Sequence, residues 1–146
     1  MKINIFKKTR VPISDKKIEK IIGLVLKNEK ISRGILNILF LNNAEILTLN
    51  RKFRKVNTPT DVLAFGGDAF KRKKIPRFLG DIAVSVEMAE KRARLYGNSV
   101  KKECALYIIH GVLHLVGYDD ESLLKRKIML MRQEMILNRI CETKVL

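Results

Sequence analysis

The segment from Cys104 to Val116 restricts the fold more than any other part of the chain. Nearly all of its residues are apolar, and it follows Ser99, a residue type that often caps helices. A helix that is apolar on every side has to be covered on every side, so we expect it to lie inside the protein. The chain has 146 residues, enough to build such a core without disulfides or metals as structural staples.

The rest of the sequence places strands early and helices late. Hydrophobic alternation and short apolar runs predict strands at 3–6, 35–41, 62–65 and 78–86. Helical spacing and capping residues predict helices after Ser14, at 43–54 opened by Asn43, at 86–96 capped by Ser85, after Ser99, and from Asp119 or Asp120 to about residue 140. A basic loop is expected to follow Gly66 and Gly67, up to about Arg77. The pattern predicts a small α/β (α+β) domain of about four strands flanked by helices.

Both histidines of the chain, His110 and His114, lie in the apolar helix. Residues four apart share one face of a helix, so the two imidazoles should lie side by side. Each imidazole needs a polar partner in such a setting, and one divalent cation can serve both. The alternative is a pair of core histidines that are hydrogen-bonded to backbone or carboxylate groups.

A third ligand is predicted after the helix ends. Gly117 can adopt the left-handed conformation that ends a helix and turns the chain back, which would bring Asp119 and Asp120 near the imidazoles. His110, His114 and Asp120 then supply two nitrogens and a carboxylate oxygen, a set that leaves a position open for water, as in catalytic zinc sites. Asp120 can instead cap the last helix, and Asp119 is the second choice as ligand.

The residue after the first histidine is informative. Zinc proteases of the H-E-x-x-H type place their general base there, whereas this chain has Gly111. A zinc peptidase built on this helix would lack its base. A glycine at this point can also let another element of the fold pack closely against the helix.

The charge balance indicates a polyanionic partner. Thirty Lys and Arg residues against fifteen Asp and Glu give a formal net charge of +15. Basic residues cluster at 51–55, 71–77, 91–94 and 125–127, without a known recognition motif. Nucleic acid is therefore the leading partner, and an ordinary solvated basic surface is the alternative.

Targeting signals and cysteines are less informative. The first fifteen residues contain no apolar run of signal-peptide length, and no segment reaches the roughly 18 apolar residues needed to span a bilayer. We therefore expect a cytoplasmic protein that does not associate with membranes. Cys104 and Cys141 are far apart in the sequence and are interpreted as reduced residues without a chemical role.

Three motifs resemble those of a known family. The sequence HGVLHLVGYDD (110–120) is similar to the H-G-x-L-H-L-x-G-Y-D-H signature of the bacterial YbeY family. Members of this family are metal-dependent endoribonucleases that take part in ribosomal RNA maturation. LNRKFRKVNTPTDVLAF (49–65) resembles the L-N-x-x-[FY]-R-x-x-D-x-P-T-[DN]-V-L-S-F motif, and LGDIAVS (79–85) resembles the G-D-I-x-I-S strand. The motifs occur in the family's order.

The resemblance implies a mixed four-stranded sheet with the histidine helix at its centre, in one domain over residues 1–146. It makes His110 and His114 metal ligands and places Arg54 in the active-site cleft as the catalytic residue. Asn57 and Ala64 differ from the usual Asp and Ser of the motif. The important departure is Asp120, which replaces the third histidine, because a carboxylate adds negative charge and favours harder cations.

The resulting hypothesis is a single-strand-preferring endoribonuclease of ribosomal RNA maturation and ribosome quality control. It would carry one zinc ion, with nickel or manganese as alternatives, and would act on RNA or ribosomal particles rather than DNA. A ribosome-assembly factor with a structural metal is the second hypothesis, and a metalloprotease is the third. Asp61 and Asp81 also lie in the motifs, but strand-end carboxylates usually hydrogen-bond neighbouring loops, so both are interpreted as structural.

Overall fold

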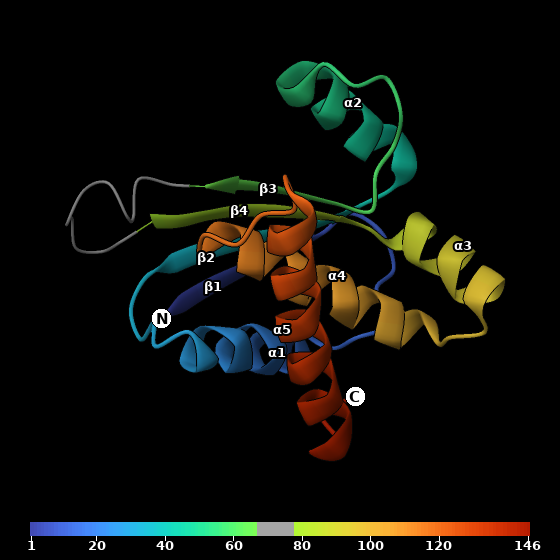
Figure 1. Ribbon diagram of the computed structural model, residues 1–146. Helices are drawn as coiled ribbons and strands as arrows, with labels where there is room; N and C mark the ends of the chain where they lie inside the picture. The colour runs from blue at the N-terminus through green and yellow to red at the C-terminus, as the bar shows by residue number, and fades with distance from the viewer. Residues whose placement is uncertain (67–77) are drawn as a thin grey trace.

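A computed structural model describes residues 1–66 and 78–146 of the chain. The basic loop expected up to Arg77, including the run at 71–77, lies outside the described residues. The strands are β1 (Lys2–Lys7), β2 (Ile35–Leu41), β3 (Val62–Gly66) and β4 (Phe78–Ser85). The helices are α1 (Asp15–Asn28), α2 (Asn43–Arg54), α3 (Val86–Tyr96), α4 (Val100–Leu115) and α5 (Leu123–Glu142). The predicted fold class is confirmed (Figure 1).

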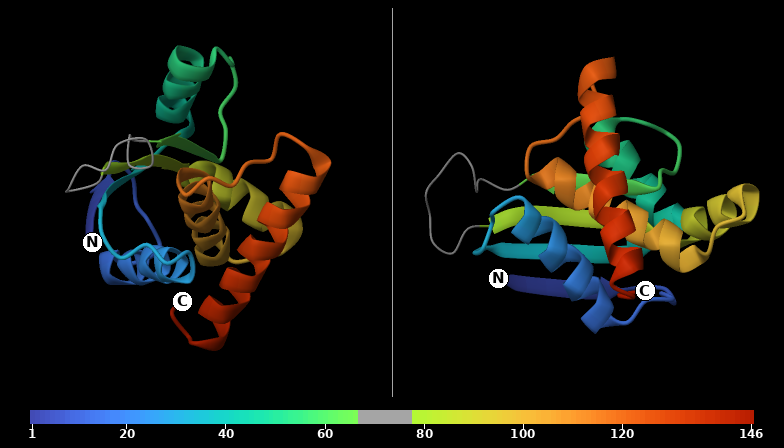
Figure 2. Two further views of the ribbon diagram at one scale, coloured as in Figure 1. Left: turned by 60° about the vertical axis from the view of Figure 1, so that its left-hand side comes forward. Right: turned by 60° about the horizontal axis from the view of Figure 1, so that its bottom comes forward.

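The four strands form one mixed sheet in the order β1-β2-β4-β3. β1, β2 and β4 are mutually parallel, and β3 pairs antiparallel with β4 at one edge. A parallel pair needs a crossover connection, and α1 provides it between β1 and β2. α1 and α4 cover one face of the sheet with α5 packed over them, whereas α2 lies on the other face (Figures 1 and 2).

From Glu103 onward α4 is mostly buried, as its composition predicts, and Leu106, His110 and His114 are only partly exposed. Its buried residues include Cys104, Ala105, Ile108, Ile109, Val112 and Leu113. Gly111 brings this helix close to the sheet: a Cβ atom there would lie 2.7 Å from Cγ2 of Ile82 on β4 and 3.2 Å from Cγ2 of Val62 on β3. The predicted role of Gly111 in close packing is confirmed.

Gly111→Ala is therefore expected to destabilise the protein by about 1–3 kcal/mol, because the added methyl group overpacks the helix–sheet contact. The better helix propensity of alanine offsets at most about 1 kcal/mol of this loss. Gly23→Ala on α1 is the matched control, since a Cβ atom there meets nothing within 4 Å. Urea unfolding should show the two variants moving in opposite directions, and similar shifts would contradict the packing argument.

α2 rests on a small apolar cluster of its own. Four buried residues form it, Leu41, Ile46, Leu63 and Ala83. Leu39, Leu49 and Phe65 pack against them, while the main core lies on the opposite face under α1 and α4. α2 is thus attached to the sheet separately from the main core.

The predicted caps are confirmed for α1, α3 and α4, whose Ser14, Ser85 and Ser99 hydroxyls accept backbone N–H groups. Two other predictions were wrong. Asn42 rather than Asn43 caps α2, through a reciprocal pair of hydrogen bonds with Glu45. Ser122 caps α5, so neither Asp119 nor Asp120 takes that role, and α5 extends to Glu142.

Cys104 is buried and Cys141 is exposed, and both thiols are free. Burial raises the pKa of the Cys104 thiol to about 12, and Glu90 and Glu103 add to this effect, so the thiol stays protonated and inert. Among residues 1–66 and 78–146, no helix is both long and apolar enough to cross a bilayer.

Candidate metal centre

The turn after α4 is built around Gly117. Val116 ends the helix and Gly117 follows with φ 111°, a conformation that side chains rarely adopt. The Gly117 N–H donates to the His114 carbonyl at 3.2 Å, and the Tyr118 N–H donates to the Leu113 carbonyl at 3.0 Å. These two bonds form a Schellman motif, which satisfies the last carbonyls of the helix and reverses the chain. The role predicted for Gly117 is confirmed.

The returning segment is held in place by Tyr118. Its hydroxyl donates to the Glu29 carboxylate, with Oε2 at 3.0 Å. Glu29 lies directly after α1 and also approaches Nε of Arg132 on α5 at 3.6 Å. Tyr118 therefore ties the loop to two helices. Sequence reasoning missed this contact because Glu29 is 89 residues away.

The two imidazoles meet through their Nε2 atoms, which lie 3.1 Å apart. The rings are edge to face with centroids 4.7 Å apart, and both side chains are half-buried. Nδ1 of His110 lies 2.7 Å from Oε1 of Gln133, a residue of α5 that is 7% exposed. Because an amide oxygen accepts, Nδ1 of His110 carries the hydrogen and its Nε2 keeps a lone pair, the arrangement of many metal-binding histidines.

The environment favours neutral His114. Burial lowers its pKa most, and electrostatic interactions with His110 and Arg54 lower it further, against opposing effects of Asp120 and a hydrogen bond to the backbone of Tyr118. A neutral imidazole is the form that binds a metal ion.

Asp120 completes the group. One ligand atom from each of His110, His114 and Asp120 lies within 4.8 Å of the others. Asp119 is used differently, since its carboxylate accepts the Glu121 N–H and lies 3.5 Å from Nζ of Lys125. The structure thus brings together the three residues that the sequence singles out and leaves Asp119 outside the group.

The donor set fits a small divalent cation. Two ligand atoms that bind a tetrahedral ion at ~2.0–2.1 Å lie about 3.3 Å apart, close to the observed Nε2 separation. Two nitrogens and one carboxylate oxygen also leave a fourth position open. Gln133 supplies the outer hydrogen bond that orients one ligand.

Arg54 approaches the site from another element. It is the last residue of α2, on the other face of the sheet, and its side chain is exposed. Its charge nevertheless contributes to the lowered pKa of His114, after the larger effects of burial and His110. The guanidinium of Arg54 is thus near enough to His114 for its charge to act on the imidazole.

Asp61 and Asp81 make the structural contacts expected of them. Asp61 pairs with Arg92 at 2.6 Å and accepts the Val62 N–H. Asp81 accepts a hydrogen bond from the Asn37 amide at 2.9 Å, within a row of side chains across the sheet. Neither carboxylate belongs to the histidine group.

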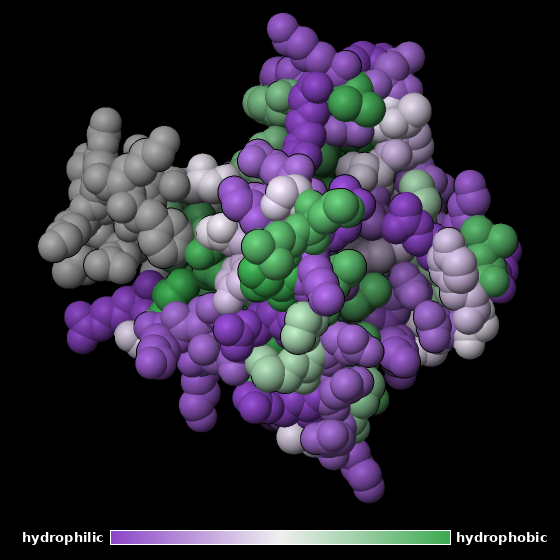
Figure 3. Space-filling view, in the orientation of Figure 1, coloured by the Kyte–Doolittle hydropathy of each residue, from purple (hydrophilic) through white to green (hydrophobic). Residues whose placement is uncertain are grey.

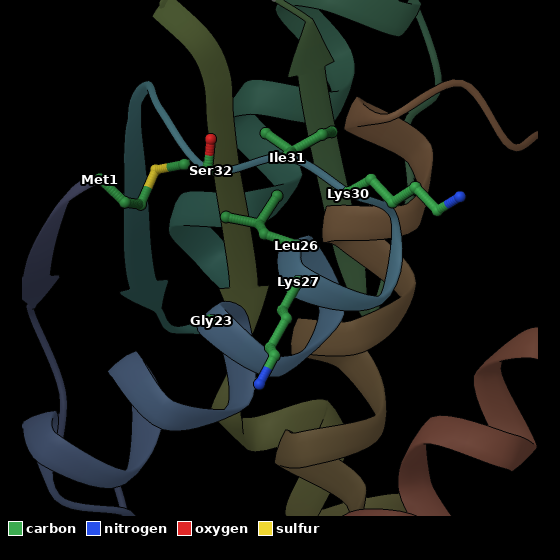
Figure 4. Close-up of a pocket in the computed structure, with 7 residues that line it drawn as sticks. All are labelled: Met1, Gly23, Leu26, Lys27, Lys30, Ile31 and Ser32. Carbon is green, nitrogen blue, oxygen red and sulfur yellow. The ribbon is translucent and has the colours of Figure 1, made fainter.

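A cavity of about 390 Å³ near the end of α1 is separate from this centre (Figure 4). Leu26, Ile31 and Met1 face its interior, while the ammonium groups of Lys27 and Lys30 point outward. None of the residues that line it belongs to the histidine group.

The fold and the site define a class of protein. It is an α/β protein with a candidate metal site of catalytic type, formed by an H-x-x-x-H helix packed on a mixed sheet and by a carboxylate from the turn that follows the helix. Comparison with known families is more specific. The chain belongs to the YbeY family, since the family model described as Endoribonuclease YbeY matches residues 3–141.

Relatives and a solved structure agree with this assignment. An Endoribonuclease YbeY from Pelotomaculum thermopropionicum is 40% identical over 111 residues, which cover 74% of this chain and 73% of the relative. The Endoribonuclease YbeY from Acholeplasma laidlawii is 32% identical over 139 residues, with 95% and 96% covered. The solution structure of TM1509 from Thermotoga maritima superposes with a TM-score of 0.66 at 27% identity, covering 94% of this chain and 88% of that one.

Proposed function

We propose that this protein is a metal-dependent endoribonuclease that cleaves phosphodiester bonds in single-stranded RNA. The observation that carries the proposal is the convergence of His110, His114 and Asp120 at one point in a chain of the YbeY family. The proposed domain extends over residues 1–146, and the proposed setting is ribosomal RNA maturation and quality control in the cytoplasm.

Each residue of the site has a defined part in this proposal. His110, His114 and Asp120 would hold the cation, and Gln133 would keep His110 in the tautomer whose Nε2 can bind it. The chemistry that such an ion would supply there is polarisation of a phosphate oxygen and activation of water. Arg54 binds the phosphate with its planar guanidinium group and neutralises the charge that develops during cleavage. Zinc is proposed, with manganese and nickel as alternatives. The Asp120 carboxylate favours a harder cation such as manganese more than a third imidazole would.

The surface supports a polyanionic substrate. The net charge is +15, and hydrophilic side chains cover most of the face shown in Figure 3. An apolar patch interrupts them where α5 lies. The exposed apolar residues of α5 include Leu123, Leu124, Ile128 and Met131. Contacts from Lys and Arg position the phosphate backbone without reading sequence, so target choice within RNA is left to shape and unpaired bases.

The direct test is single-turnover cleavage of a structured RNA that contains loops and paired stems. The protein, stripped with a chelator, is reloaded with zinc, manganese or nickel. We expect cleavage in the loops with at least one of these ions and none in the chelated sample. Failure with all three ions would reject the nuclease and favour a ribosome-assembly factor.

RNA affinity should fall steeply with salt, because each phosphate contact releases counterions. With 6–10 contacts the loss between about 50 and 200 mM salt is on the order of 10³- to 10⁵-fold. Fluorescence anisotropy with a labelled oligoribonucleotide and metal-free protein measures it without cleavage. A nearly flat dependence would leave the positive charge unexplained and favour a protein partner.

A further inference from the structure

Phe53 is an exposed aromatic residue in the last turn of α2. Its side chain is 58% exposed, although Ile46 and Leu49 on the same side of the helix pack against the sheet. Its ring lies 5.2 Å from the ring of Phe65 on β3, at an angle of 59°. Phe65 therefore supports the ring from one side, and much of it remains open to solvent.

The surroundings of this ring are cationic. Arg51, Lys52, Arg54 and Lys55 flank it in the chain, and all four are exposed. Nζ of Lys52 lies 5.3 Å from the centroid of the Phe53 ring. This ammonium group lies over the ring, so a stacking base would take its place. An exposed aromatic ring among basic side chains is the combination that binds single-stranded nucleic acid, since the ring stacks on a base while the charges contact phosphates.

Phe53 is also adjacent in the chain to Arg54, which the proposed function assigns to phosphate binding. Phe53 precedes Arg54 in the chain, so their Cα atoms are about 3.8 Å apart. Adjacent side chains of a helix point about 100° apart, but the long and exposed Arg54 side chain can still reach a phosphate of the strand whose base stacks on Phe53.

We propose that Phe53 is a base-stacking residue, whose ring binds one unpaired RNA base next to the phosphate that Arg54 contacts. The inference rests on the proposed function for the identity of the ligand as RNA. It goes further in naming the residue that selects unpaired bases. A paired base has both faces covered by its neighbours, so it reaches a side chain only after leaving the stack.

The experiment measures binding by metal-free protein, so that cleavage plays no part. The probe is an oligoribonucleotide of about 12 nucleotides, within the usual site size for single-strand binding, with an abasic version of the same length for comparison. Phe53→Leu keeps apolar volume against Phe65 but removes the ring, and Phe53→Trp keeps a stacking surface. Phe6→Leu is the matched control, because Phe6 is 52% exposed and is followed by Lys7 and Lys8.

We expect Phe53→Leu to bind the single strand roughly 10-fold more weakly than the wild type, within the range measured for loss of one stacking contact. Phe53→Trp and Phe6→Leu should bind like the wild type. On the abasic oligonucleotide, wild type and Phe53→Leu should bind equally.

Two results would overturn the inference. One is unchanged binding of the single strand by Phe53→Leu, which would leave the ring as a contact for a protein partner. The other is an equal loss on the intact and abasic oligonucleotides, which would mean that no base is involved. The proposed function is judged separately. If Phe53→Leu weakens binding but the wild type shows no metal-dependent cleavage, the nuclease is rejected. If the wild type cleaves RNA but Phe53→Leu binds it unchanged, only the stacking role is rejected.

Discussion

His114→Ala is expected to release the metal ion and to abolish RNA cleavage while the fold remains intact. Removing one of three ligands should cost more than the roughly 10- to 100-fold loss of affinity that follows from losing an outer hydrogen-bond partner. The fold should survive because the main core is built from apolar residues around α4 and does not need the ion. Elemental analysis of purified protein, together with thermal unfolding, measures both effects.

The neighbouring carboxylates supply a matched pair for the same measurement. Asp120→Asn removes a charged ligand of the proposed site, whereas Asp119→Asn changes a carboxylate that contacts Glu121 and Lys125 instead. Metal should be lost from the first variant and kept by the second. Equal metal contents in the wild type, His114→Ala and Asp120→Asn would show that the ion binds elsewhere in the chain.

Arg54→Lys is expected to lower the rate of RNA cleavage by on the order of 10²-fold or more, the scale measured when one transition-state donor is removed. Lysine keeps the charge but loses the planar fork that contacts two phosphate oxygens at once. Affinity for RNA should change little, because 29 other Lys and Arg residues remain. Single-turnover cleavage and binding of the same RNA separate the two effects.

Arg51→Lys is the control for this variant. Arg51 lies on the same helix and is also exposed, but its Nε donates to the Asn57 side chain. It should retain nearly full cleavage. If Arg54→Lys cleaves as fast as the wild type, Arg54 has no part in the chemistry. If the variant loses RNA affinity in proportion to its loss of cleavage, Arg54 contacts the RNA phosphate backbone without a role in the chemical step.

Local sequence patterns predicted the parts of the site that depend on local structure. The spacing of His110 and His114 fixes their shared helix face, and Gly117 fixes the reversal that returns Asp120. The cap of α2 was also predictable, because Asn42 followed by Glu45 three residues later is the capping-box pattern. Asn43 is the same residue type, so cap preference alone does not distinguish the two positions.

Contacts between distant elements were not predictable in the same way. Gln133 hydrogen-bonds His110, which lies 23 residues earlier in the chain. The only sequence indication of this contact is that Gln133 is a polar residue on the buried face of α5, together with Met129, Ile136 and Ile140. The Tyr118–Glu29 contact leaves no trace in local periodicity. Four polar residues in a row precede α5, and which of them caps it depends on the path the chain takes after α4.

The separate attachment of α2 has a dynamic consequence. Segments that bury little apolar surface open locally at lower free energy than the main core. α2 rests on a cluster of four buried residues, whereas α4, with His110 and His114, lies in the main core. The amide hydrogens of α2, which carries Phe53 and Arg54, are therefore expected to exchange at lower free energy than those of α4, which carries the two imidazoles.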